Sequence, residues 1–332
     1  MKFHRIVLAA VIALALLSAM AYSANLEPGQ RRSSSNSTFV QPFLGRWDLT
    51  LRTPKRERPS WLDLYRVHGV LKANFVGRWA NAHPLSQVNI VQDTLTFTSP
   101  KEYENRRTDM EFKGKLVNGR LVGSTTGPDG TPWTWIGRRA PLLTRKRSPQ
   151  WGAPVALFNG KNLNGWYEYS ADNAIPTRHW KVVHGTLVSP GHGPELVSTR
   201  KFEDFKLHVE YNLGPRSNSG VYLRGRYEVQ LENDSRQEPP SHHNGAIYGF
   251  LAPAPELPRT TGKWQTFDIT LTGRKVTVVQ NGATIIDNKE IPGITGGALD
   301  SHEGAPGPIY LQGSEEGHVA FRNIVVTPAI EP

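Results

Sequence analysis

Apolar and polar residues alternate along most of the chain, in short runs that end at glycine, proline, asparagine or aspartate. In the run 45–51, for example, Trp47, Leu49 and Leu51 fall on one face. Because successive side chains of a strand point to opposite faces, this period of two predicts half-buried β-strands. Long stretches with a helical period are absent after the N-terminal residues, so the sequence predicts an all-β protein.

The strands predicted in residues 39–140 form a group of their own. They include the alternating run 88–98 and an Asn118-Gly119 pair, which is the strongest short signal of a β-hairpin. A second turn is expected at 127–130. We interpret this group as a small antiparallel β-barrel or meander domain of unknown role. Residues 141–154 are rich in proline and arginine and are expected to be a linker.

A second group of strands fills residues 155–330. At least eight are expected, at 180–183, 205–213, 221–224, 227–232, 264–272, 276–279, 309–312 and 319–326. An Asn281-Gly282 pair marks a further hairpin turn. So many strands with no helix between them predict a β-sandwich of the jelly-roll kind.

The N-terminus has the pattern of a signal peptide. Basic residues at Lys2 and Arg5 precede the apolar run 6–20, and small residues such as Ala24 follow it. This apolar run is shorter than the roughly 20 residues that span a bilayer, so no stable membrane span is expected after cleavage. We expect a signal peptide over 1–24, a flexible tether over 25–38, and export to the periplasm or the medium.

The net charge of +10 is unevenly distributed. Residues 1–152 hold 23 Lys and Arg against 10 Asp and Glu, whereas the remainder holds 16 against 19. The excess lies scattered through stretches rich in proline and serine, and not on one face with stacking aromatic residues. Nucleic-acid binding is therefore not expected. The chain has no cysteine, so its stability cannot depend on disulfides.

Chemistry-bearing side chains concentrate on the strand expected at 227–232. Glu228, Gln230 and Glu232 share one face of it, and Tyr222 and Arg224 are expected to share a face of the preceding strand. If the strand that carries His208 also neighbours these two, the combined face suits the hydroxyls of a sugar. The alternative is an ordinary solvated face of an antiparallel sheet, which alternates in the same way.

Further candidates lie in the turns beside these strands. Asn218 precedes the first of them and is placed to reach the edge of a groove. The loop 239–245 offers His242 and His243 near Asp234, and a histidine near carboxylates is a candidate base. Together with Glu232 these residues are also candidate ligands of a divalent metal, although no tight ligand spacing supports one.

Several segments resemble, in order, the 3-keto-disaccharide hydrolase domain family over about residues 155–328. The segments are 157–166, 180–187, 205–210, 218–221, 227–230, 245–249, 263–264, 281–282, 311–312 and 321–324. The resemblance implies a concanavalin-like sandwich that acts on glycosides whose ring C3 has been oxidised to a ketone. It therefore implies a sugar 3-dehydrogenase as an upstream partner.

The chemistry of such a substrate assigns roles to the candidate residues. A ketone at C3 acidifies the C2–H, so a base can form an enolate and expel the C1 substituent before water adds. Glu228 or His243 is expected to serve as base or acid, with Glu232 or Asp234 at the place of a further acid. Arg224 and Gln230 are expected to bind the ring or the enolate, and Tyr248 and Gln312 to line the groove.

Two other functions fit the same residues. The run 228–232 resembles the strand of laminarinase-type retaining glycosidases, with Gln230 where that group has an aspartate. A sandwich of this kind also serves non-catalytic glycan-binding proteins of the cell envelope. Turnover of ordinary glucans would indicate the first, and binding without product the second.

Overall fold

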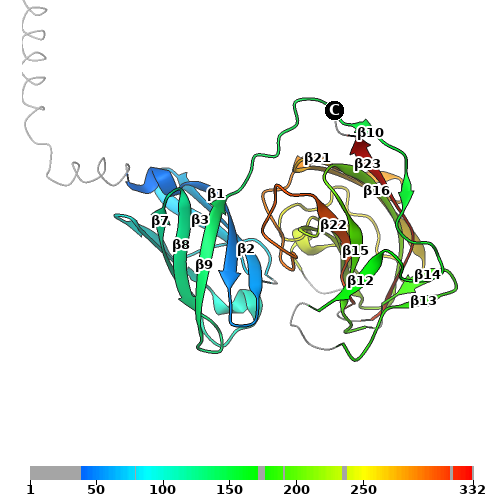
Figure 1. Cartoon of the computed structure of the whole chain (residues 1–332), viewed down its shortest axis with the longest axis horizontal. Coiled ribbons are helices and arrows are strands. Elements are labelled where there is room, and N and C mark those ends of the chain that lie inside the picture. Colours follow the sequence, from blue (N-terminus) through cyan, green and yellow to red (C-terminus); the bar gives the residue numbers. More distant parts are fainter. Residues whose placement is uncertain are drawn as a thin grey trace, which may run out of the picture. The chain divides into compact units, whose positions relative to one another are not determined.

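The computed structural model describes residues 39–78, 80–170, 176–189, 191–233, 238–314 and 317–330. Antiparallel strands make up almost all of the regular structure, as predicted (Figure 1). Three short 3-10 turns, η1 (Gln41–Phe43), η2 (Lys101–Glu104) and η3 (Pro240–His242), interrupt them. The predicted signal peptide and tether lie outside the described residues. Within those residues, no helix is long and apolar enough to cross a membrane.

The first nine strands form one sheet in the order β4-β3-β2-β1-β9-β8-β7-β6-β5. They are β1 (Gly45–Arg52), β2 (Glu57–Val67), β3 (Val70–Val76), β4 (His83–Pro84), β5 (Val88–Val91), β6 (Thr94–Ser99), β7 (Met110–Val117), β8 (Arg120–Thr126) and β9 (Pro132–Arg139). The sheet curls until β3 and β5 are in contact, so it encloses a core around Trp47 and Trp135. The predicted small β-barrel is confirmed.

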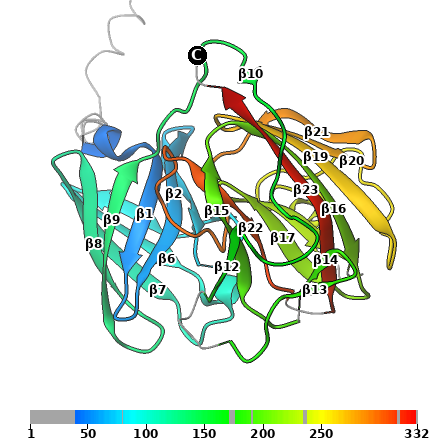
Figure 2. The same ribbon diagram turned by 45° about the vertical axis from the view of Figure 1, so that its right-hand side comes forward.

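The remaining strands form two sheets that face each other (Figure 2). The larger has the order β13-β14-β23-β16-β19-β20-β21, with β10 and β11 also paired to β23, and the smaller has the order β12-β15-β22-β17-β18. The bounds are β10 (Gln150–Trp151), β11 (Val155–Ala156), β12 (Trp166–Tyr169), β13 (Lys181–Val183), β14 (Thr186–Val188), β15 (Glu195–Phe202), β16 (Phe205–Leu213), β17 (Asn218–Leu223), β18 (Tyr227–Glu232), β19 (Trp264–Thr272), β20 (Lys275–Gln280), β21 (Ala283–Glu290), β22 (Gly307–Leu311) and β23 (Val319–Ile330). The core between the sheets includes Leu207, Val229 and Phe267, all essentially inaccessible. The predicted sandwich is confirmed.

Both predicted Asn-Gly hairpin turns are present. Asn118 and Gly119 have φ angles of 49° and 74° between β7 and β8, and Asn281 and Gly282 have φ angles of 50° and 83° between β20 and β21. Positive φ at both central residues is the requirement of the turn that matches the right-handed twist of paired strands. Local sequence alone therefore sets these two connections.

The condition under which His208 would share a face with Glu228 is not met. Strand β16, which carries His208, belongs to the larger sheet and pairs with β19 and β23, whereas β17 and β18 belong to the smaller one. His208 bonds Asp268 on the outer side of the larger sheet, at 2.7 Å between Nδ1 and Oδ1. Alternation identifies the faces of a strand, but the neighbours of that strand depend on distant residues.

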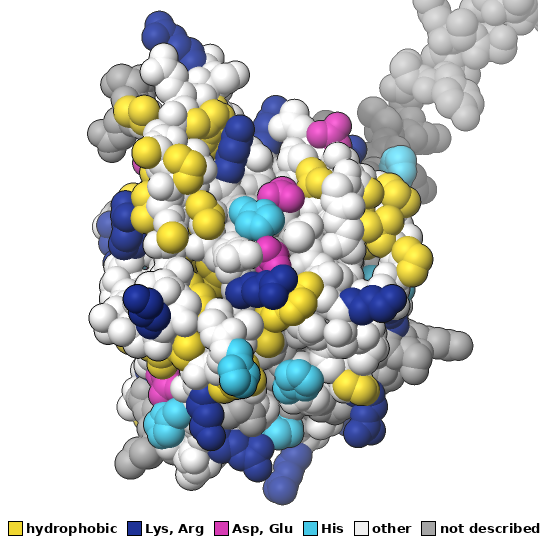
Figure 3. Space-filling model, turned by 90° about the vertical axis from the view of Figure 1, so that its right-hand side faces the viewer, with side chains coloured by type: hydrophobic (Ala, Val, Ile, Leu, Met, Phe, Trp, Pro, Cys, Tyr) yellow, Lys and Arg dark blue, Asp and Glu magenta, His cyan; other side chains and the backbone are white. Residues whose placement is uncertain are grey.

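Figure 3 shows acidic, basic and histidine side chains intermixed on the surface that it views.

Residues Leu44–Pro332 form one compact unit. The boundary of a first domain at residue 140 and the start of a second at residue 155 therefore stay predictions. The strands nevertheless fall into two groups by their pairing, because no hydrogen-bonded ladder among the described strands joins β1–β9 to the sheets of the sandwich.

Candidate functional site

The smaller sheet of the sandwich presents polar side chains on the face that points away from the core. Tyr222 lies directly opposite Glu228 in the β17–β18 ladder, and Gly220 lies opposite Gln230. Residues directly opposite each other in an antiparallel pair share a face. Strand β22 extends this face, because Tyr310 lies opposite Tyr222. The register thus gathers a carboxylate, an amide and two phenols from three strands.

Glu228 occupies space that a glycine leaves open. A Cβ placed on Gly220 would overlap Oε1 of Glu228 and lie 2.9 Å from its carboxyl carbon. The backbone N–H of Glu228 donates to Oγ1 of Thr295 at 3.0 Å, so a neighbouring loop also holds this part of the strand. Only 4% of Glu228 is exposed. The carboxylate of Glu228 is therefore held over the neighbouring strand β17.

Tyr222 and Tyr310 stack beside this carboxylate. Their ring centroids are 4.2 Å apart and their planes differ by 15°. The Tyr222 hydroxyl donates to the carbonyl of Gly296 at 2.9 Å and also has a hydrogen bond with Glu228. Burial, followed by the negative charge of Glu228, raises the pKa of Tyr222 well above its ordinary value. The phenol therefore stays protonated and acts as a donor.

A second carboxylate, Glu195, lies on the same face at the start of β15. Its Oε2 accepts a 2.6 Å hydrogen bond from the backbone N–H of Gly313, and its carboxylate also has a hydrogen bond with the side chain of Tyr310. Burial and the charge of Glu195 raise the pKa of Tyr310. Sequence reasoning missed Glu195 because residues 195–198 are all buried, so β15 begins without the alternation that marks a polar face.

Three other predicted residues flank this face. Gln312 follows β22, and its backbone N–H donates to the carbonyl of Gly220 at 2.9 Å. Asn218 and Glu232 lie opposite each other at the far end of the β17–β18 ladder. Glu232 forms an ion pair with Arg259 at 3.4 Å between Oε1 and Nη1. A guanidinium supplied from outside the sheet therefore adjoins this end of the site.

The expected position of Arg224 is wrong. Strand β17 ends at Leu223, and Arg224 takes the left-handed conformation, with φ of 52°, in the turn that follows. Its Nη2 donates at 2.6 Å to the carbonyl of Gly273, in the turn between β19 and β20 of the larger sheet, and at 3.2 Å to the hydroxyl of Tyr227. The side chain is fully buried among core residues. Because the turn reverses the alternation, Arg224 does not share the face of Glu228.

The loop after β18 carries the predicted histidines. His243 contacts Glu256, at 2.9 Å between Nδ1 and Oε1, and the carbonyl of Glu238. His242 contacts Glu238 at 3.1 Å and lies against the ring of Tyr248, with centroids 4.7 Å apart.

The same loop is tied to the strand that carries Glu228. The backbone N–H of Tyr248 donates to the carbonyl of Glu228 at 3.1 Å. Asp234, a predicted catalytic residue, lies outside the described residues. No group of three or more acidic or histidine side chains that could share a metal occurs in the part of the chain that the structure describes.

This arrangement is suited to proton transfer next to a carbonyl group. A buried carboxylate accepts a proton, and a neighbouring neutral phenol donates a hydrogen bond to a developing oxyanion. The amides of Gln230 and Gln312 both donate and accept, which is what sugar hydroxyls require. The face thus brings together a carboxylate, a neutral phenol and two amides from three adjacent strands.

Comparison with known proteins gives one similar curated relative and several solved structures. A 3-keto-disaccharide hydrolase from Bacteroides thetaiotaomicron is 21% identical over 169 residues, which are 40% of this chain and 57% of that protein. The match thus spans little more than half the length of this relative. Candidate glycosyl hydrolases from Parabacteroides distasonis have TM-scores of 0.44 and 0.43, at 25% and 18% identity. They cover 57% and 53% of this chain and 96% and 94% of their own.

The family comparison covers more than half of the chain. The model of the 3-keto-alpha-glucoside-1,2-lyase-like domain matches residues 153–327, which include every described strand of the sandwich from β11 to β22 and most of β23. The resemblance inferred from the sequence segments is confirmed. The chain belongs to the family of 3-keto-alpha-glucoside-1,2-lyase-like domains.

Proposed function

We propose that this protein is a carbohydrate-active enzyme that cleaves 3-keto-glycosides by elimination followed by hydration. The observation that carries the proposal is the buried Glu228 carboxylate, held over Gly220 and beside the neutral phenol of Tyr222. The family of the domain and the name of the curated relative support the same substrate class.

The reaction divides into two balanced steps. In the first, Glu228 takes the C2 proton, the C2–H electrons form a C1=C2 double bond through an enolate, and the C1–O bond breaks. The leaving oxygen keeps the electron pair of the broken C1–O bond and receives a proton. In the second step, water adds its oxygen to C1 and a proton to C2, which restores a saturated 3-keto sugar. The sum of both steps is hydrolysis.

Each role follows from the charge state of a group at the site. The enolate oxygen that develops at C3 needs a donor that does not itself lose its proton. The raised pKa of Tyr222 meets that need, with its O–H turning from the carbonyl of Gly296 to the substrate. Gln230 and Gln312 are assigned to ring hydroxyls. His243 and Asp234 stay the candidates for the acid that protonates the leaving oxygen. Glu195 holds Tyr310 in place through their hydrogen bond.

A retaining glycosidase mechanism is less compatible with strand β18. Glu228 and Glu232 are four residues apart on one strand. At about 3.3 Å per residue their Cα atoms are roughly 13 Å apart, whereas retaining enzymes hold two carboxyl groups about 5–5.5 Å apart. Glu232 is, moreover, paired with Arg259. We therefore favour the elimination route.

The proposal is tested with 4-nitrophenyl glucosides, either intact or chemically oxidised at C3. Purified protein should release nitrophenol from the keto form only. Run in D₂O with NMR detection, the reaction should place deuterium at C2, which is the signature of proton transfer at that carbon. Glu228→Gln should lower kcat at least about 100-fold.

The control is Glu290→Gln, at a carboxylate that is 54% exposed on β21. This variant should retain full activity. Cleavage of the unoxidised glucoside would indicate the glycosidase mechanism, and saturable binding without product would indicate a glycan-binding protein. Either result overturns the proposal.

The setting of the reaction is part of the same proposal. The N-terminal pattern of a basic start and a short apolar run supports export. A sugar dehydrogenase that oxidises C3 would then supply the substrate, because the ketone must exist before elimination can occur. Fractionation of cells that express the full chain tests export through the loss of residues 1–24 from the exported form.

A further inference from the structure

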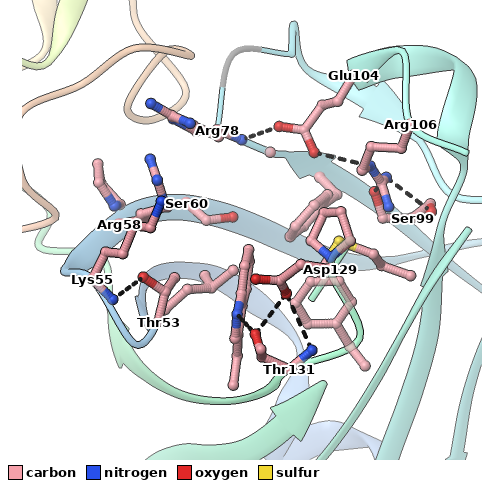
Figure 4. Close-up of a pocket in the computed structure, with 18 of the residues that line it drawn as sticks. Thr53, Lys55, Arg58, Ser60, Arg78, Ser99, Glu104, Arg106, Asp129 and Thr131 are labelled. Carbon is pink, nitrogen blue, oxygen red and sulfur yellow. Dashed lines mark hydrogen bonds and ion pairs between the residues drawn. The ribbon is translucent and has the colours of Figure 1, made fainter. Parts of the chain in front are cut away.

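The barrel formed by β1–β9 contains a cavity that the proposed reaction does not use. Its volume is about 450 Å³, and residues from 51 to 133 line it. Figure 4 shows this cavity, with loops carrying Lys55, Arg78 and Glu104 around it. Small-molecule sites are commonly about 300–1,000 Å³, and the mouths of β-barrels are a frequent location for them.

Several glycines of the barrel make room for large neighbouring side chains. Trp135 fills the core beside Gly114 and Gly123, where a Cβ on either residue would overlap the indole. The glycines thus let one large side chain occupy the interior. At the cavity, Gly77 makes room for the carboxylate of Glu104 in the same way, and the small side chains of Ser60 and Ser99 also line the open space. Glycine thus admits a neighbouring side chain in both parts of the barrel.

The walls of the cavity are mainly apolar. They include Leu51, Phe75, Met110, Phe112 and Trp133. A group buried there loses contact with water, so a ligand with many hydroxyls would pay a desolvation cost that these side chains cannot offset. The walls favour an aromatic or aliphatic body.

Trp133 is held in a fixed orientation at this wall. Its Nε1 donates to Oγ1 of Thr131 at 3.0 Å, and Thr131 in turn donates to Asp129 at 2.6 Å. On one side the indole occupies the space that Gly127 leaves open. An aromatic ring anchored in this way loses little conformational entropy when a ligand packs against it.

The charged residues of the lining carry a net positive charge. Four are basic (Lys55, Arg58, Arg78 and Arg106) and two are acidic (Glu104 and Asp129). Both carboxylates already accept hydrogen bonds from within the chain. Glu104 accepts from the backbone N–H of Arg78 at 2.5 Å and pairs with Arg106 at 3.3 Å between Oε2 and Nε, and Asp129 accepts from Thr131. Because two more basic than acidic side chains line the cavity, its electrostatic field attracts an anion.

We propose that this cavity binds a small amphipathic anion, with a carboxylate or sulfonate group beside Lys55 and Arg58 and an apolar ring or chain against Trp133 and Phe112. The site is separate from the Glu228 face, so it is tested without reference to the proposed reaction. Its ligand class follows from the apolar walls and from the excess of cations in the lining.

The test uses two fluorescent probes with similar aromatic bodies. 8-Anilinonaphthalene-1-sulfonate carries a negative charge, whereas N-phenyl-1-naphthylamine is neutral. The full chain should bind the anionic probe saturably at one site, and octanoate should displace it. The double variant Lys55→Glu/Arg58→Glu should weaken binding of the anionic probe at least about tenfold and change binding of the neutral probe less than about twofold.

The matched control is Lys113→Glu/Arg120→Glu, which makes the same charge change at exposed positions of β7 and β8 outside the lining. It should bind both probes like the unmodified protein. Leu51→Trp, checked for folding by near-UV circular dichroism, should abolish binding of both probes by filling the cavity. Equal loss of anionic-probe binding in the two charge variants, or no saturable binding by the unmodified chain, would overturn the proposal.

Discussion

Gly220 and Glu228 lie on adjacent strands, and the carboxylate of Glu228 occupies the volume that a side chain at position 220 would fill. The missing Cβ thus determines where the carboxylate rests. A polar side chain on a sheet usually extends away from its neighbours toward solvent. Here it lies across the adjacent strand, within reach of Tyr222.

Gly220→Ala should displace this carboxylate. We expect a loss of stability of about 1–3 kcal/mol from overpacking, together with a fall in kcat on a 3-keto-glycoside. Glu228→Asp withdraws the carboxyl group by one methylene, so the double variant Gly220→Ala/Glu228→Asp should recover part of the stability. Urea unfolding of the four proteins gives the coupling energy, and strictly additive effects would contradict the contact.

Tyr222→Phe should separate the role of the hydroxyl from that of the ring. The ring retains its stack on Tyr310, so the free energy of unfolding should fall by only about 1 kcal/mol for the lost hydrogen bonds. If the phenol stabilises the enolate, kcat should fall about 10- to 100-fold with little change in KM. An unchanged kcat would remove Tyr222 from the proposed mechanism.

Arg224→Met should affect folding and not chemistry. Methionine fills a similar volume but leaves the buried carbonyl of Gly273 without this donor, so we expect a loss of about 1–3 kcal/mol. Activity per folded molecule, measured well below the midpoint of thermal unfolding, should be retained. Arg216→Met, at an exposed arginine in the preceding turn, should change neither quantity. A selective loss of kcat in Arg224→Met would return this residue to the site.

Stability should decline steeply in alkali. Burial raises the pKa of Tyr211, Tyr222, Tyr227 and Tyr310 in the folded protein above the ordinary value of 10.0. Above about pH 10 the unfolded chain loses these protons while the folded chain retains them, so rising pH favours unfolding.

The absorbance at 295 nm measures this effect. These four phenols should ionise together with unfolding and not before it. Tyr222→Phe removes one of them, so the free energy of unfolding should fall less steeply with pH than in the unmodified chain. Full ionisation of all tyrosines in a protein that is still folded would contradict the burial.

The local pattern of the sequence predicted individual strands well. The runs at 205–213, 227–232 and 264–272 have the bounds that alternation indicates, and both Asn-Gly pairs form the expected turns. These features depend on neighbouring residues only, since the period of two and the conformational freedom of glycine act over a few positions. Strand β15 was missed because its first residues are buried on both faces and do not alternate.

What the chain determined by itself is the all-β class, the strands with a polar face and the family of the domain. Tertiary structure decided which faces meet. Pairing joins residues far apart in sequence, so it alone placed β16 in the opposite sheet and brought Glu195 beside Tyr310. It also directed the side chain of Arg224 into the core and left a cavity inside the barrel. Alternation specifies on which side of a strand a residue lies, whereas the partner on that side depends on how the whole chain packs.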